Sequence, residues 1–201
     1  MSLTKPTVSL AIMLLELRED TMQTYIISKT FLSIYRYLTA LTKSIDRVVR
    51  AKSINSSSFN DYYKNNTEDQ TAEILALTNK KITLINIKLI VDQTLQKLQP
   101  DQARVLTLKY IDNLTSAQIS DLMQLNTRTY FRKANSAIKE FNNQLEKFFK
   151  QNTTIQNNIL NEPWIKHLLS QFDKDTKVNC DIDGSFVYKT IIKNLRKAAA
   201  Y

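Results

Sequence analysis

The sequence predicts an all-α protein in which a long helical hairpin is followed by a tri-helical helix-turn-helix and by a small C-terminal helical module. The chain of 201 residues contains one glycine, Gly184, and three prolines. Tight β-hairpin turns need residues with positive φ, which glycine mainly supplies, so a strand-rich fold is disfavoured. Apolar residues recur instead at steps of three and four, the period of a helix. Asparagines in the connections are suitable helix C-caps.

A helical hairpin is predicted in the first half of the chain. One helix is expected from Thr21 to about Lys52, where the apolar residues keep the helical period. The polar stretch that follows is rich in turn formers and is expected to be a connection. Thr67 is a suitable N-cap for a second helix, which continues to Pro100. The hairpin is closed into a bundle either by the apolar run Val8–Leu17 or by a second copy of the chain, which would make it a dimerisation element.

The chain is expected to divide into three segments. Residues 1–95 form the N-terminal hairpin or bundle, which serves oligomerisation or partner binding. Residues 96–150 carry the helix-turn-helix, and residues 151–201 form a C-terminal accessory segment. After Phe149 the periodicity is lost, which predicts a linker; a short helix then opens at Pro163, and a terminal helix carries the apolar residues from Phe186 to Leu195.

The charge of the chain favours a polyanionic partner. Its 28 Lys and Arg against 19 Asp and Glu give a net charge of +9 at pH 7. Such an excess favours nucleic acid or anionic lipid, although solubility alone also explains a net charge. The run Val8–Leu17 is too short for a membrane span and lacks the basic start of a signal peptide. We therefore expect a cytoplasmic protein without membrane attachment.

The sequence gives little support for catalysis, for a cofactor or for a metal. With one glycine, a phosphate-cradling loop of the Walker or dinucleotide-binding type is excluded. His167 is the single histidine and Cys180 the single cysteine, so neither a zinc site nor an internal disulfide is expected. Asp181 and Asp183 are spaced like loop acids and fall short of a calcium loop. We expect a protein that is not an enzyme.

The stretch from Leu98 to Phe141 divides into three short helices by its own capping residues. Pro100 stands at a permitted first-turn position of the first helix. Thr115 or Ser116 caps the second helix, whose apolar positions are Ile119, Leu122 and Met123, and Asn126 or Thr127 caps the third. Two helices joined by a few residues, the second amphipathic and basic at its start, form the helix-turn-helix pattern. A plain bundle segment with a solvated basic face is the alternative.

The third helix has a packing side and a reading side. Its packing side is expected to hold Tyr130, Ala134, Ala137, Ile138 and Phe141. Arg128, Arg132 and Asn135 have the types and spacing that read base edges in a major groove, because Arg pairs with guanine and Asn with adenine. Phe131 and Lys139 also face outward. The expected phosphate contacts, which hold register without reading sequence, are Ser116, Gln118, Thr127, Thr129 and Lys133.

This segment resembles the C-terminal DNA-binding region of the sigma-70 family, and more closely the sigma-like regulators of phages and Firmicutes typified by the ArpU group. The residues that carry the resemblance lie on all three helices: Leu98, Pro100, Val105, Leu106, Tyr110, Leu114, Thr115, Ile119, Thr129, Tyr130, Arg132, Lys133, Ala137, Ile138 and Lys139. The third helix begins TYFR, where the group commonly has a TYYR-like start. The resemblance implies DNA binding and RNA polymerase as a further partner.

Three positions depart from the family pattern. Gln124 replaces the glycine that is usual in the turn of this family. Asn113 replaces the glycine that usually precedes Leu114. Ser120 occupies the position of the small residue that is usual inside the second helix. The turns are therefore expected to be looser or to be set by other contacts. Nothing in residues 21–95 resembles the sigma core region, so a sigma-like regulator is favoured over a complete sigma factor.

The preferred function is a sequence-specific transcriptional regulator that binds double-stranded DNA as a dimer. Three alternatives remain open. A phage small terminase subunit joins a helix-turn-helix to oligomerisation helices, an adaptor would use the tri-helical unit as scaffold, and the basic segment from Ser185 to Ala200 would attach to a membrane surface.

Overall fold

The computed structural model describes residues 6–57, 67–166, 169–170, 189 and 192, and its described part contains helices and no strand. The elements in order are α1 (Pro6–Ser57), α2 (Thr67–Gln96), α3 (Pro100–Leu106), the π-helix η1 (Thr107–Ile111), α4 (Ser116–Leu122), α5 (Thr127–Gln151) and α6 (Thr153–Leu160). The all-α prediction is confirmed.

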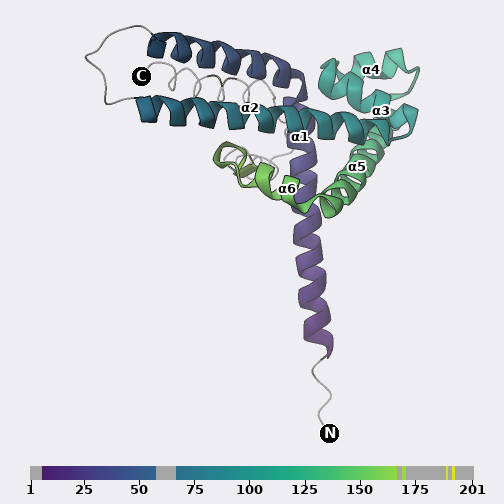
Figure 1. Cartoon of the computed structure of the whole chain (residues 1–201). Coiled ribbons are helices and arrows are strands. Elements are labelled where there is room, and N and C mark those ends of the chain that lie inside the picture. Colours follow the sequence, from purple (N-terminus) through teal and green to yellow (C-terminus); the bar gives the residue numbers. More distant parts are fainter. Residues whose placement is uncertain (1–5, 58–66, 167–168, 171–188, 190–191, 193–201) are drawn as a thin grey trace.

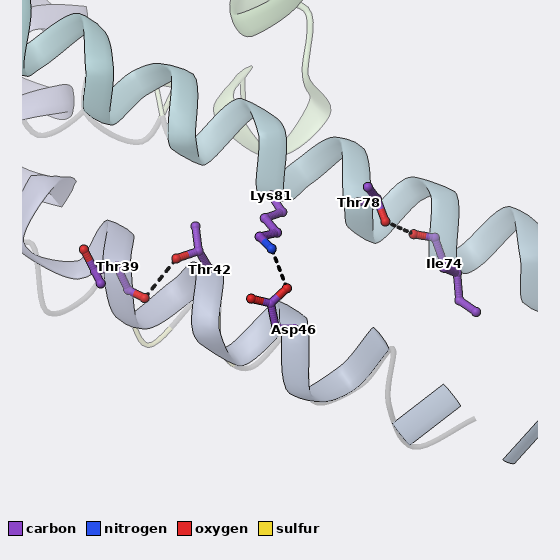
Figure 2. Close-up of polar contacts among 6 residues, drawn as sticks. All are labelled: Thr39, Thr42, Asp46, Ile74, Thr78 and Lys81. Atoms are coloured by element: carbon purple, nitrogen blue, oxygen red, sulfur yellow. Dashed lines mark hydrogen bonds and ion pairs between the residues drawn. The ribbon is translucent and has the colours of Figure 1, made fainter. Parts of the chain in front are cut away.

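The predicted hairpin is formed by α2 and the C-terminal half of α1, which lie side by side in opposite directions (Figure 1). Ile45 of α1 and Leu84 of α2 are among the buried residues between them. On the outside, Lys81 forms an ion pair of 2.6 Å with Asp46, which Figure 2 shows bridging the two helices. Lys52 and Glu73 form a second bridge of 2.6 Å near the far end. Packing and these cross-links fix the hairpin.

The first helix begins earlier than predicted, at Pro6 instead of Thr21. Proline is permitted in a first helical turn, and neither glycine nor proline interrupts the stretch that follows, so the run Val8–Leu17 continues into the same helix. Figure 1 shows this N-terminal part of α1 extending away from the other helices. The expectation that Val8–Leu17 closes the hairpin of its own chain is therefore wrong.

One hydrophobic core joins the hairpin to α5. Phe31 and Leu32 of α1, Ile87 of α2, and Phe141 and Leu145 of α5 are fully buried in the same cluster. Within it, the Ser28 hydroxyl donates a hydrogen bond of 2.9 Å to Oδ1 of the buried Asn142. A buried polar pair of this kind favours one register of the two helices, because any shift leaves both groups without a partner.

Two further boundaries differ from the sequence expectation. The predicted first helix of the helix-turn-helix is divided, since its last five residues form the π-helix η1, in which Asp112 N donates to Thr107 O at 3.0 Å. The predicted linker after Phe149 is instead the end of α5 followed by α6. Ile159 of α6 is buried in the main core, so a tertiary contact stabilises a helix that local periodicity did not indicate.

The C-terminal predictions are tested only at their start. Residues 163–166 are helical, as expected from Pro163 at a helix opening. The terminal helix, His167 and Cys180 lie outside the described residues, apart from two isolated positions of that helix.

Candidate nucleic-acid interface

A small core of its own holds α3, α4 and α5 together. It contains Val105 of α3, Ile119 of α4, and Tyr130 and Ala134 of α5, all buried. Farther along the same side of α5, Ala137, Ile138 and Phe141 enter the main core. All five residues predicted for the packing side of the third helix are therefore buried, which confirms the predicted direction of α5. One side of the first half of α5 is thus held by two successive clusters, and its other side is open.

The helices α4 and α5 both begin at a side-chain N-cap. Thr115 caps α4, because its side chain accepts a hydrogen bond from Gln118 N while the Gln118 side chain accepts one of 2.9 Å from Thr115 N. Asn126 caps α5 by accepting a bond of 2.7 Å from Thr129 N. Of the alternatives left open by the sequence, Thr115 and Asn126 are the capping residues. The side chain of Gln118, a predicted phosphate contact, is engaged in its capping box.

Asn113 and Gln124, the two residues that replace a usual glycine, have left-handed backbone. Asn113 has φ of 57° and Gln124 has φ of 53°. At the end of α4, Gln124 N donates to Asp121 O at 3.1 Å and Leu125 N donates to Ser120 O at 2.8 Å. This pair of bonds is the Schellman motif, with Gln124 where glycine is usual. The turn after α4 is therefore set by capping hydrogen bonds, which is one of the two expectations for a turn without its usual glycine.

Replacing Gln124 by glycine is expected to raise the free energy of unfolding by about 0.5–1 kcal/mol. A side chain with a Cβ in the left-handed region costs about 1–2 kcal/mol, and the gain exceeds the added entropy of glycine in the unfolded chain. Denaturant unfolding of the purified variant measures the difference. Asn113→Gly is the matched control and should gain less, because asparagine tolerates this conformation. An unchanged or lower stability of the Gln124 variant contradicts the argument.

The open face of α5 carries one stripe of the side chains that the sequence predicts to read DNA. Arg128, Arg132, Asn135 and Lys139 are all exposed and stand at steps of four, three and four residues, so they share one side of the helix. From the first to the last residue the stripe rises about 17 Å. The following acid, Glu140, accepts hydrogen bonds from Gln144 and Asn143, which lower its pKa.

The other predicted contact residues surround this stripe unevenly. Thr127 is exposed, and Ser116 and Thr129 are half-buried. Phe131 is 49% exposed, and its ring packs edge-on against Tyr130 at 5.1 Å. Lys133 is half-buried and forms an ion pair of 3.2 Å with Asp101 of α3. Each predicted residue therefore lies on or beside the reading unit, although Lys133 already has an anionic partner.

The three apolar positions named for the second helix differ in burial. Leu122 is 53% exposed. The short helix turns only Ile119 and Ser120 fully inward, so Leu122 faces solvent. Its neighbour Met123 packs against the small core instead.

A family model described as Sigma-70, region 4, matches residues 88–139. The match runs from the last turns of α2 to the first half of α5, about a quarter of the chain. It confirms the resemblance to the sigma-70 DNA-binding region, a helix-turn-helix family of DNA-binding domains and not of enzymes. No curated protein and no solved structure matches the chain.

The described residues contain no group of three His, Cys, Asp or Glu side chains placed to hold a metal ion. No helix in the described ranges is long and apolar enough to cross a membrane.

Proposed function

We propose that the protein is a sequence-specific, sigma-like transcriptional regulator of the cytoplasm that reads the DNA major groove with α5. The observation that carries this proposal is the stripe of Arg128, Arg132, Asn135 and Lys139 on the open face of a helix within the matched Sigma-70 region 4 segment. Arg128 and Arg132 suit the two acceptors of guanine, and Asn135 suits adenine. Lys139, three turns into the helix, suits a phosphate at the groove edge.

The surrounding residues would position the duplex. Ser116, Gln118, Thr127 and Thr129 lie at the starts of α4 and α5, where backbone N–H groups attract phosphates. Phe131 would contribute apolar contact, which suits a thymine methyl group. Lys133 would reach a phosphate only after its ion pair with Asp101 is broken, so we propose a lesser role for this residue.

The finer identity of the regulator is also a proposal. We place it with ArpU-type regulators of phage origin, on the TYFR start of α5, and we propose RNA polymerase as its protein partner. We further propose that this regulator has no catalytic activity and needs no cofactor. The boundaries at residues 95 and 150 remain a proposal for its functional division.

The direct test is the binding of mixed-sequence duplex DNA by the full chain over a series of salt concentrations, measured by fluorescence polarisation. Three basic side chains and one helix N-terminus at the interface predict a slope of log affinity against log salt of at least about −3. Affinity should then fall roughly 60-fold or more between about 50 and 200 mM salt. No binding at the lowest salt would remove the DNA-binding function and favour an adaptor.

The proposed dimer is supported by an apolar stripe on the outer face of α2. Leu75, Ile82, Ile85 and Leu89 are between 41% and 57% exposed and follow the seven-residue repeat of a coiled-coil seam. The opposite face of α2, with Leu84 and Ile87, is buried against its own chain. A helix that is apolar on both faces is expected to be covered on both.

Replacing Ile82 and Leu89 by asparagine is expected to convert a dimer into a monomer. Both side chains are half exposed in one chain, so the fold of the monomer should persist. Light scattering coupled to size-exclusion chromatography gives the mass. Ile54→Asn, an equally apolar change at an exposed position of α1, should leave the dimer intact. A monomeric wild type contradicts the dimer, and a ring-sized mass would favour a packaging protein of the small-terminase kind.

A further inference from the structure

A second basic stripe lies on α1, far along the chain from the reading helix. Arg36, Lys43, Arg47 and Arg50 are exposed and stand at steps of seven, four and three residues. They share the side of α1 opposite its buried residues, which include Ile34, Leu38, Leu41 and Ile45. From Arg36 to Arg50 the stripe extends about 21 Å along the helix.

Among the residues that the structure describes, no acidic side chain forms an ion pair with this stripe. Between residues 25 and 57, α1 contains one acid, Asp46. Figure 2 shows its carboxylate directed at Lys81 of α2, to which it is bonded at 2.6 Å. Arg36 lies over the ring of Tyr37 at 4.7 Å and keeps its charge. The positive charge of the stripe is therefore available to a ligand.

The basic stripe does not stabilise α1 itself. Lys43 and Arg47, and Arg47 and Arg50, are like charges four and three residues apart, and such pairs destabilise a helix. An ordinary solvated face interleaves both signs of charge. A polyanion bound along the face would remove this repulsion.

The chemistry of the face selects nucleic acid among polyanions. Between Arg36 and Arg50 the remaining exposed residues are the small Thr39 and Ala40, and the first exposed large apolar residue is Ile54, one turn beyond. A helix that lies in a lipid surface uses an apolar face, and protein hot spots cluster in well-packed, desolvated pockets instead of along an exposed row of cations. Contacts to a phosphate backbone need only charge and close approach.

We propose that this α1 stripe is a second contact surface for duplex DNA, which neutralises phosphates flanking the site read by α5. The inference rests on the proposed function, because the helix-turn-helix would bring the duplex to the protein. Figure 1 shows the C-terminal half of α1 running away from the end of the hairpin at which α3 and α4 lie, so the DNA it meets is outside the reading site. Its length matches about six base pairs of duplex.

The test compares a stripe variant, Lys43→Glu/Arg47→Glu/Arg50→Glu, with a control variant of equal charge, Lys97→Glu/Lys147→Glu/Lys166→Glu. All six positions are exposed. Each protein is titrated over a salt series with mixed-sequence duplexes of two lengths, one that fills the reading site alone and one with long flanks. On the long duplex the stripe variant should lose about 2.7 from the salt slope, about 0.9 for each cation removed, which makes the fall in affinity between about 50 and 200 mM salt roughly 40-fold smaller. On the short duplex the two variants should behave alike.

The outcomes separate the two proposals. A stripe variant with the slope of the control on the long duplex overturns the second surface and leaves the reading helix in place. Absence of wild-type DNA binding at low salt overturns both. Unchanged DNA binding with loss of binding to vesicles of anionic lipid would also overturn the DNA surface and assign the stripe to a membrane.

Discussion

Replacing Arg128 and Arg132 together by alanine is expected to lower the affinity for duplex DNA by at least about 30-fold. Each guanidinium on a guanine is worth about 1–3 kcal/mol, and the two act on the same open face of α5. The phosphate-contacting groups at the helix starts remain, so the loss should be largest for a selected target sequence and smaller for mixed DNA. Fluorescence polarisation at one fixed salt concentration measures both affinities.

Two further variants make this expectation specific. Arg128→Lys keeps the charge but removes the planar fork that pairs with a base, so it should lose sequence preference while keeping most of its binding to mixed DNA. Lys150→Ala removes a cation from the far end of the same helix, where the side chain pairs with Glu146 at 3.1 Å, and should bind as the wild type does. An equal loss of DNA affinity in Lys150→Ala and in the double alanine variant would mean that the effect comes from net charge alone and contradict a specific contact.

The helical fold was predictable because the periodic apolar pattern is local information. The start of α2 at Thr67 follows from a capping residue and the inward side of α5 from the spacing of its apolar residues. The errors arose where distant contacts decide the structure. The stretch after Phe149 has weak periodicity, yet it is helical because Ile159 reaches the main core. The early start of α1 at Pro6 reflects the absence of any helix-breaking residue, which carries no periodic signal.

In the candidate nucleic-acid interface, the positions of the residues on α4 and α5 were more predictable than their contacts. For the second and third helices of this segment the sequence left two candidate N-caps each, because Ser, Thr and Asn all suit that position. The ion pair of Lys133 with Asp101 joins residues 32 positions apart in sequence, which no local pattern indicates. The α1 stripe was visible only as scattered polar positions, because its significance depends on Asp46 being directed at Lys81. Proximity across the fold is the information that the sequence lacks.

Replacing Phe141 by alanine is expected to lower the free energy of unfolding by about 3–5 kcal/mol. The ring is 0% exposed and belongs to the core that α5 shares with α1 and α2. Because this core crosses the proposed boundary at residue 95, the hairpin and the helix-turn-helix should lose stability together, in one cooperative transition. Thermal unfolding followed by circular dichroism and by the fluorescence of Trp164 measures the change and its cooperativity.

The matched control is Phe131→Ala on the same helix, which removes the same ring from a position 49% exposed and should change stability by less than about 1 kcal/mol. If Phe141→Ala instead separates unfolding into two transitions, the segments on either side of residue 95 are independent domains. A single transition means that DNA binding at α5 and charge on α1 act within one rigid unit, because Ser28 and Asn142 hold the two helices in register through the same core. The two basic surfaces would then have a fixed separation, and DNA long enough to reach both should bind with a single salt slope.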